Sequence, residues 1–427
     1  MAYCGYITTV KELRKHSNAD RLQIATVFGN DVIVNLDYEV GDLVVYFPTD
    51  GKLSEAYAKE NKLTKGMGGY MDDKKLHVTS IRLRGEKSDG LIMKVESLAK
   101  FTKVKDLKEG DTITTLNGVL ICEKYIPKSK QVKPLPNQKQ GKKTEKKNTY
   151  PFFEQHIDTA QLAYNLGAFK EGDIVYLTLK LHGTSQRTAH TIKKGKQGVL
   201  HKVIKTLFGT NGLDKLPKRW DYITGTRRVT LDTFDGGYYG GNQFRKQWHD
   251  FFVDKLHKGE EVYYEVVGYT DDGGLIMPEC DNKKTNDKQF VKEYGETTRF
   301  TYGCAVGESK VYVYRMTMTN EDGHTVEYPT ELVKLRCEQM GVDSVPILDK
   351  FIFTTHEDLL ERVKKHEDGA DPIGKTHIRE GIIVRIENKE KFKALKQKNF
   401  TFKVLEGIIK ANDTLDMEEA ESLAEDA

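Results

Sequence analysis

The chain has 427 residues, which is enough for two or three domains at about 150 residues per domain. Hydrophobic residues make up 38% of the chain and charged residues 31%, and no apolar run reaches the ~20 residues that span a bilayer. This composition argues against a membrane-spanning helix and predicts a soluble, cytoplasmic protein. Five scattered cysteines without close spacing suggest neither a disulfide framework nor a structural zinc site, and we expect reduced, buried thiols. The net charge is +3.

The first predicted elements are short strands between residues 1 and 122. Runs such as YITTV, LQIATVF and DLVVYFP are rich in β-branched and aromatic residues, and turn residues separate them. The Gly-Asn-Asp sequence at residues 29–31 favours a hairpin. We therefore expect a small β-barrel domain over residues 1–122, with an OB-like barrel as one candidate.

A basic segment follows this domain. Residues 124–147 contain nine lysines and one glutamate, with three prolines and almost no large apolar residue. Such a stretch cannot bury enough surface to offset its ordering entropy, so residues 123–150 are expected to be a linker. Its charge points to a polyanion as partner. Residues 411–427 are predicted to be an acidic tail.

Residues 151–410 mix helical and extended patterns. Helical spacing occurs at residues 158–169, 242–256, 330–341 and 356–366, whereas DIVYLTLK, EEVYYEVVGY, KVYVYRMTM and GIIVRIE have the composition of strands. The two kinds of element do not alternate regularly. The fold class is therefore predicted to be α+β, with antiparallel strands, rather than a doubly wound parallel sheet.

Lys180 is the first candidate for chemistry. It ends an apolar strand and precedes His182, Gly183 and Thr184, so its amine lies at a turn where glycine allows close approach of a backbone or a ligand. A lysine at such a position can lose its charge by desolvation and act as a nucleophile. The competing interpretation is a surface lysine at a strand end.

Two acidic residues are further candidates. Glu265 lies inside the strand YYEVVGY, where an unpaired carboxylate would be costly, and Glu380 directly precedes a glycine and an apolar strand. Ordinary salt bridges at strand ends would explain both residues equally well.

Pairs of lysines and tyrosines complete the set. Lys396 and Lys398 are two residues apart, on one face of an extended segment, and the same holds for Tyr312 and Tyr314. The tyrosines are suited to stack on a nucleotide base, or they belong to a core. The lysines either bind an anion or form a solvated face.

The order of these motifs favours the functional interpretation. Lys-x-x-Gly, a strand Glu-x-x-Gly, an aromatic strand, Glu-Gly-x-x-x-Arg and Lys-x-Lys follow one another between residues 180 and 400. This arrangement resembles the covalent nucleotidyltransferase superfamily of ATP-dependent ligases and capping enzymes. A β-rich module before the motifs, and only 29 residues after Lys398, resemble RNA ligases of the Deinococcus and Naegleria type. The resemblance implies an N-terminal OB module and an antiparallel-sheet nucleotidyltransferase domain with helices at residues 151–410.

The resemblance also implies roles for the lysines and the acids. Lys180 would attack the α-phosphorus of ATP as a neutral amine and form lysyl-AMP. Lys396 and Lys398 would bind the α-phosphate and disfavour a proton on Lys180. Glu380 would hold a divalent cation, and Glu265 would contact the ribose or that metal. Mg²⁺ is the expected ion, with Mn²⁺ as a substitute, because carboxylates and phosphates suit hard cations.

The remaining implied contacts are to the nucleotide. Arg227 matches the Ser-Arg motif of the superfamily with threonine in place of serine, and Arg228 is an alternative. Gly183 would allow close approach to the nucleotide. Either Tyr312 or Tyr314 would stack on the adenine.

The predicted function is an ATP-dependent RNA ligase that joins 3′-OH and 5′-phosphate ends through lysyl-AMP and an adenylylated 5′ end. RNA ends in a nicked duplex are the expected partners, RNA–DNA junctions are an alternative substrate, and a monomer is expected. Two other functions stay open. One is a nucleic-acid-binding protein with an inactive nucleotidyltransferase domain, and the other is a different adenylyl- or guanylyltransferase.

Overall fold

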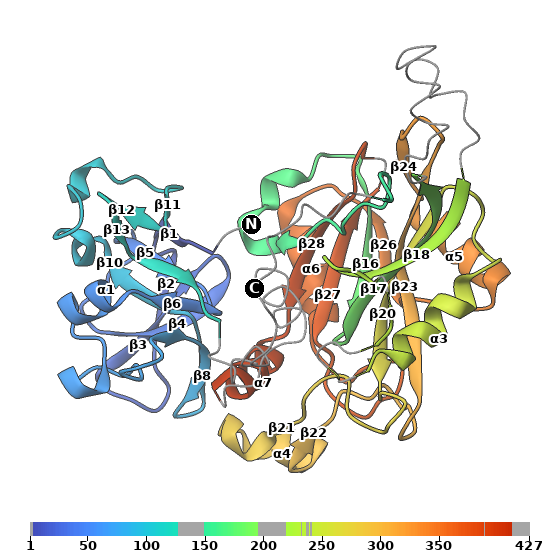
Figure 1. The fold of residues 1–427 in the computed structure, drawn as a ribbon. Coiled ribbons are helices and arrows are strands. Elements are labelled where there is room, and N and C mark those ends of the chain that lie inside the picture. Colours follow the sequence, from blue (N-terminus) through green and yellow to red (C-terminus); the bar gives the residue numbers. More distant parts are fainter. Residues whose placement is uncertain are drawn as a thin grey trace, which may run out of the picture.

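The computed structural model describes the residue ranges 3–126, 149–194, 219–231, 233–235, 239, 241–387 and 389–411. Most of the predicted basic linker and nearly all of the predicted acidic tail lie outside these residues. Figure 1 shows two β-rich parts, which we call the N-terminal module (residues 3–126) and the second module (residues 149–411). Helix α7 (Phe400–Ala411) of the second module lies between them.

The N-terminal module consists of short strands. They are β1 (Gly5–Thr9), β2 (Glu12–Lys15), β3 (Leu22–Val27), β4 (Asn30–Asn35), β5 (Leu43–Phe47), β6 (Gly51–Leu53), β7 (His77–Val78), β8 (Ser80–Leu83), β9 (Glu86–Asp89), β10 (Leu91–Lys94), β11 (Thr112–Ile113), β12 (Thr115–Leu116), β13 (Val119–Leu120) and β14 (Cys122–Lys124). They pair in the orders β10–β5–β1–β11, β2–β3–β4, β14–β6–β7, β8–β9 and β12–β13. Within residues 3–126 these sheets do not join into one closed barrel, because edge strands such as β2 and β11 pair on one side only.

Strands β3 and β4 form the predicted hairpin. Val27 pairs with Asn30, so Phe28 and Gly29 are the two loop residues, with φ of 49° and 73°. Positive φ at both loop residues is the requirement of a type I′ turn. The turn therefore begins one residue before the Gly-Asn-Asp pattern.

The second module contains two large sheets. One has the order β15 (Ala160–Gln161), β28 (Lys393–Lys398), β27 (Gly381–Ile386), β16 (Ile174–Lys180) and β26 (Ile347–Ile352). The other has the order β19 (Thr230–Leu231), β18 (Arg219–Thr226), β17 (Thr184–Lys193), β20 (Glu260–Gly268), β23 (Ser309–Thr319) and β24 (Thr325–Glu327), with β25 (Asp343–Ser344) beside β23. Apart from the pairs β15–β28 and β23–β25, all ladders described in these sheets are antiparallel.

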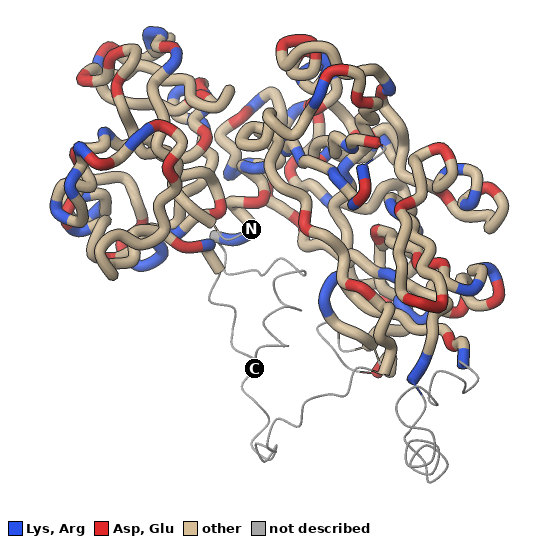
Figure 2. The backbone as a smooth tube through the Cα atoms, turned by 90° about the horizontal axis from the view of Figure 1, so that it is seen from above, with Lys and Arg blue, Asp and Glu red and all other residues tan. Residues whose placement is uncertain are grey.

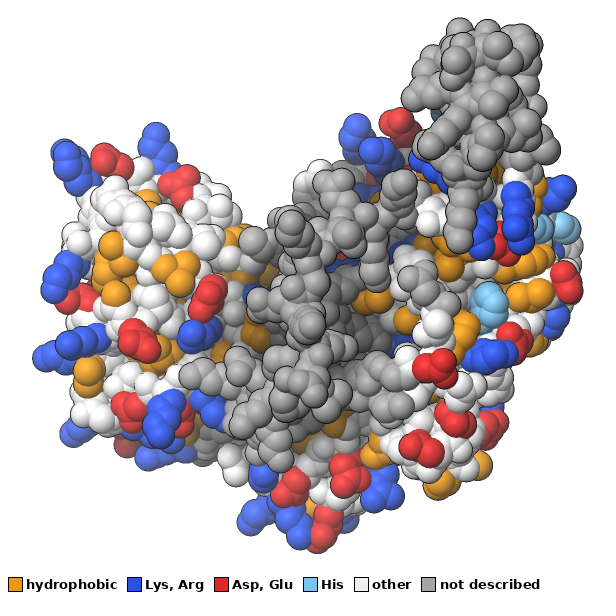
Figure 3. All heavy atoms as spheres, viewed as in Figure 1, with side chains coloured by type: hydrophobic (Ala, Val, Ile, Leu, Met, Phe, Trp, Pro, Cys, Tyr) orange, Lys and Arg blue, Asp and Glu red, His pale blue; other side chains and the backbone are white. Residues whose placement is uncertain are grey.

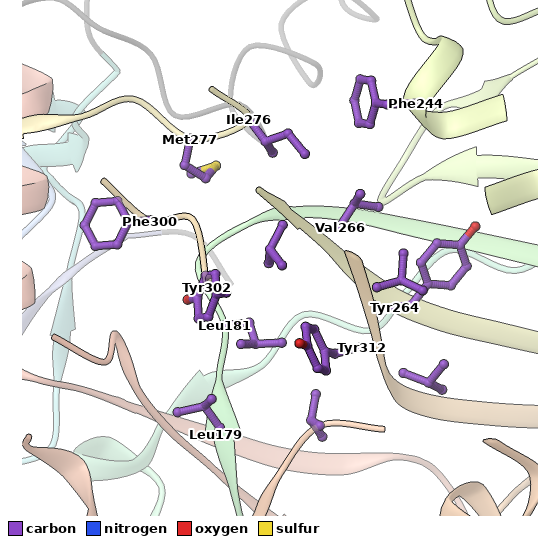
Figure 4. Packing of buried hydrophobic residues seen from close by; sticks show 14 of the residues in the cluster. Leu179, Leu181, Phe244, Tyr264, Val266, Ile276, Met277, Phe300, Tyr302 and Tyr312 are labelled. Carbon is purple, nitrogen blue, oxygen red and sulfur yellow. The ribbon is translucent and has the colours of Figure 1, made fainter. Parts of the chain in front are cut away.

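A large hydrophobic core lies in the second module. It includes Leu179 and Leu181, which flank Lys180, together with Tyr302 and Tyr312, and Figure 4 shows these residues among their neighbours. Phe402, Leu405 and Ile409 of α7 belong to the same core. The residues on either side of Lys180 are therefore held in place by burial. Burial of apolar surface contributes about 25 cal/mol per Å² and is the main source of folding stability in this core.

Three of the four predicted helices are confirmed: α3 (Gln243–Phe252), α5 (Thr330–Met340) and α6 (His356–Glu367). Helix α5 ends at Gly341, whose φ of 70° is the usual left-handed helix end. The prediction for residues 158–169 is wrong, because this stretch forms β15 and two 3₁₀ turns, Leu162–Tyr164 and Leu166–Ala168. Its Asn165 and Gly167 are poor helix formers. Helix α7 was not predicted.

Charged residues of both signs are interspersed along the backbone of both modules (Figure 2), and Figure 3 shows the same mixture on the visible surface. In the described part of the chain, no helix combines the length and the apolar character needed to cross a membrane.

Candidate active site

Lys180 lies where the chain passes from one large sheet to the other. It is the last residue of β16, and after Leu181–Gly183 the chain continues as β17 in the second sheet. β16 pairs with β26 on one side and β27 on the other, so its end is held in place by two ladders. The Lys180 side chain is 22% exposed, and its Nζ lies 2.7 Å from Oε1 of Glu380.

Gly183 allows this crossing. A Cβ atom at this position would lie 2.4 Å from the carbonyl oxygen of Val266 in β20 and 2.9 Å from Cγ of Glu265. Any side chain would therefore push β17 away from β20. The preceding residue, His182, donates its backbone N–H to the hydroxyl of Tyr302 at 2.7 Å, which fixes the turn from the other side.

Glu380 connects Lys180 with Lys398. Its side chain is buried, and Oε1 also lies 3.5 Å from Nζ of Lys398. The next residue, Gly381, begins β27, where a Cβ atom would lie 2.1 Å from the carbonyl oxygen of Gln397 in β28. Glycine is thus required for the close pairing that brings Glu380 and Lys398 together.

Lys398 has a second acidic partner. Glu406 in α7 accepts from Nζ of Lys398 at 2.9 and 2.8 Å. Burial alone would lower the pKa of Lys398, but Glu406 and Glu380 together raise this pKa above the ordinary lysine value. Lys398 is therefore a permanent cation beside Lys180. Lys396 lies two residues earlier on β28, opposite Ile383.

A pocket of about 110 Å³ opens beside Lys180 between the two sheets. Thr178, Lys180, Ile383 and Arg385 line it from the first sheet, and Ser185, Glu265 and Tyr314 line it from the second; His156, Arg227 and Phe392 also border it. Of the predicted site residues in the described ranges, Gly183, Tyr312, Glu380, Lys396 and Lys398 do not line this pocket. Glu380 contacts the pocket-lining Lys180 directly, and Lys398 contacts Glu380.

The two predicted tyrosines of β23 have different surroundings. Glu265 and Tyr264 pair with Tyr312 and Val313, whereas Tyr263 pairs with Arg315, so Tyr314 is an extra, bulged residue. Tyr314 lines the pocket and shares a hydrogen bond of 2.9 Å with the hydroxyl of Ser185, whereas Tyr312 belongs to the core.

The two candidate arginines follow β18. Nη2 of Arg227 lies 2.7 Å from Oδ1 of Asp158, and Arg227 lines the pocket. Arg228 is more exposed and lies 3.6 Å from the other oxygen of Asp158. The geometry therefore favours Arg227 of the two.

Sequence reasoning missed several residues of the site. His156 enters the pocket wall from a segment without any motif, and its ring lies 5.1 Å from that of Tyr314 and 5.7 Å from that of Phe392. Burial, together with nearby arginines, lowers the pKa of His156 well below the ordinary histidine value, so the ring is neutral. Glu406 was missed because α7 was missed.

A divalent cation at this site would need oxygen ligands from the protein. Within the described residues, no group of three or more acidic, histidine or cysteine side chains forms a metal cage. Glu380, however, has a buried Oε2 atom without a hydrogen-bond partner, 3.9 Å from Nδ1 of His182. Mg²⁺ needs only one or two carboxylates when water and phosphate complete its shell. The site fits such an ion.

Known proteins agree with this architecture in the N-terminal part. The family model of an OB-fold domain matches residues 5–95. No curated protein matches the sequence. The chain thus combines an OB-fold module with a second module of mostly antiparallel sheets and a few helices.

Solved structures extend the likeness to most of the chain. Naegleria gruberi RNA ligase is similar in a mutant form with ATP and Mn, at 15% identity and a TM-score of 0.57 over 93% of this chain and 98% of that one. A mutant form described as apo has 17% identity and a TM-score of 0.59 over 94% and 97%. The form with PPi has 16% identity and a TM-score of 0.56 over 92% and 96%. The expected fold, that of the Naegleria type of RNA ligase, is therefore confirmed.

Proposed function

We propose that the protein is an ATP-dependent RNA ligase that joins 3′-OH and 5′-phosphate ends. The observation that carries this proposal is the meeting of three sequence motifs in one place: Lys180 contacts Glu380, and Glu380 contacts Lys398, beside a pocket between two sheets. A structural ion pair alone does not require a pocket at the lysine. The fold shared with Naegleria gruberi RNA ligase supports the same function.

In the first step, Nζ of Lys180 attacks the α-phosphorus of ATP. A P–N bond forms, the bond to pyrophosphate breaks, and the amine loses a proton. An ammonium that donates to Glu380 at 2.7 Å has no free electron pair, so Lys180, whose side chain is 22% exposed, must first release a proton to solvent. Lys398 and Lys396 would neutralise charge on the transferred phosphate, which is greatest in the transition state.

The adenosine would occupy the pocket. Tyr314 would stack on the adenine, with Ile383 on the opposite sheet, and Arg227 and Glu265 would contact the sugar or the phosphates, which their positions in the pocket wall support. Glu380, through its unpartnered oxygen, and Glu265 would hold Mg²⁺ or Mn²⁺. That ion supplies charge neutralisation at the phosphates.

In the second and third steps, the 5′-phosphate of one RNA end takes AMP from Lys180, and the 3′-OH of the other end then expels it. The OB-fold module would hold the nucleic acid, since such modules bind strands through stacking and phosphate contacts. A nicked RNA duplex presents both ends together and is the proposed substrate.

Measuring both AMP transfer to the protein and joining of RNA tests this proposal. Wild-type protein given ATP and Mg²⁺ should gain the mass of one AMP, and with a nicked RNA duplex it should yield joined RNA and free AMP. EDTA should abolish both products, and Mn²⁺ should restore them. Absence of the adduct would instead support an inactive nucleotidyltransferase, and an adduct formed only with GTP would support a guanylyltransferase.

Tyr314 and Tyr312 provide a matched test of the pocket. Tyr314→Leu should raise the ATP concentration for half-maximal AMP transfer about fivefold, because a stacking contact is worth about 1 kcal/mol beyond area burial. Tyr312→Leu should instead lower the free energy of unfolding by about 2 kcal/mol, since it leaves a gap in the core, with ATP dependence unchanged. ATP titration and thermal melting measure the two effects. The opposite pattern would assign the adenine to Tyr312.

A further inference from the structure

Helix α7 connects the second module to the N-terminal module. Nζ of Lys410 lies 2.9 Å from Oδ1 of Asp50, which precedes β6, and Lys403 forms an ion pair with Asp89 of β9. At the start of the helix, the guanidinium group of Arg82 in β8 lies over the ring of Phe400, 5.6 Å from the centre of that ring. One side of α7 is thus bound by the N-terminal module, while its apolar side belongs to the core of the second module.

A line of alternating charges runs from this interface to Lys180. Lys410 lies 3.4 Å from Glu406, and Glu406 lies 2.8 Å from Lys398. Lys398 lies 3.5 Å from Glu380, which contacts Lys180 at 2.7 Å. Lys410, Glu406, Lys398 and Glu380 each have partners of opposite charge on both sides.

Because these four charged side chains are buried, the loss of any one of them should disturb the others. The side chains of Lys410, Glu406, Lys398 and Glu380 are 3%, 9%, 13% and 2% exposed. Burial would raise the pKa of Glu406, but Lys398 and Lys410 hold this pKa well below its ordinary value, so the carboxylate is charged. Poorly screened charges attract strongly, and removing one partner displaces its neighbours.

We propose that Glu406 and Lys410 are positioning residues that couple the docking of the N-terminal module to the geometry around Lys180. This inference rests on the proposed function. Asp50 holds Lys410, and Lys410 in turn holds Glu406 at the position where Glu406 contacts Lys398. When Asp50 withdraws or Lys410 is lost, Glu406 loses this support and shifts, and Lys398 loses its position beside Glu380 and Lys180.

Two lysines of the same helix give a matched test. Lys410→Gln and Lys403→Gln each remove one ion pair between α7 and the N-terminal module, but only Lys410 also contacts Glu406. Single-turnover AMP transfer, followed by intact mass at several ATP concentrations, gives a maximal rate and a half-saturating concentration. Lys410→Gln should lower the maximal rate at least about fivefold with half-saturation within about twofold, because the transferred phosphate, not the adenosine, is affected. Lys403→Gln should change neither value by more than about twofold.

Two further variants separate positioning from stability. Lys410→Arg keeps the charge and should restore the maximal rate to within about twofold of wild type. Asp50→Asn breaks the same link from the N-terminal module and leaves α7 intact, so its rate should fall as well, even if Lys410→Gln melts early. Thermal midpoints are recorded for all variants.

The outcomes distinguish the two proposals. If wild type gains AMP while Lys410→Gln and Asp50→Asn both match Lys403→Gln, the coupling is overturned and the proposed function stands. If Lys410→Arg remains as slow as Lys410→Gln at an unchanged midpoint, charge is not the cause and the coupling is also overturned. If wild type gains no AMP at all, the proposed function fails, and the coupling fails with it.

Discussion

Intact-mass analysis after incubation with ATP and Mg²⁺ is expected to show one added AMP on the wild-type chain and none on Lys180→Ala. The substitution removes the only atom proposed to bond to phosphorus, so AMP transfer should fall by at least about 1,000-fold, as for other covalent nucleophiles. Folding should be retained, because Lys180 is partly exposed at the end of β16, and its neighbours Leu179 and Leu181 carry the core packing.

Lys334→Ala is the matched control for this experiment, since it removes a second lysine that lines the pocket. It should still gain one AMP. Peptide mapping of the adduct should place the AMP on Lys180. An adduct that persists in Lys180→Ala and disappears in Lys334→Ala would assign the nucleophile to α5 and contradict the motif order.

Glu380→Gln should give the second large effect. The amide keeps the shape but removes the charge shared by Lys180 and Lys398, so two cations face each other without an anion between them. AMP transfer should fall at least about 100-fold, because both cations and the proposed metal site lose their position. The free energy of unfolding should fall by about 3 kcal/mol, the usual cost of breaking a buried pair.

Glu387→Gln separates the two parts of this effect. Glu387 directly follows β27 as Glu380 directly precedes it, and it is buried and lies 3.0 Å from Arg385. The loss of stability should be similar, but AMP transfer should stay within about threefold of wild type, since Glu387 contacts neither lysine. Equal losses of AMP transfer in both variants would reduce Glu380 to a structural residue.

The motif order in the sequence was sufficient to place Lys180, Glu265 and Glu380 near one pocket. Each of these residues lies at a strand end or within a strand, where alternation and burial restrict the backbone strongly. Arg227 also lies at the pocket, as the Thr-Arg pattern indicated. The roles of these residues in catalysis stay predictions until the variants are measured.

Other parts of the site could not be read from local patterns. The bulge at Tyr314 is set by pairing between β20 and β23, which a single strand sequence does not reveal. Helix α7 contains β-branched and aromatic residues and Gly407, all weak helix formers, so its apolar face gains stability from the core rather than from propensity. Glu406 and Lys410 could be found only once that helix was placed.

The position of α7 late in the chain affects how the protein matures on the ribosome. The strands of the N-terminal module are complete at Lys124, whereas α7 begins at Phe400, about 275 residues later. At about 5–20 residues per second, the ribosome needs roughly 15–60 s to synthesise that interval. During this time the nascent N-terminal module presents Asp50 and Asp89 without their lysine partners. A chain stalled before residue 400 would carry Lys180 and Glu380 but lack Glu406, so the charge arrangement of the site is completed only after α7 has emerged.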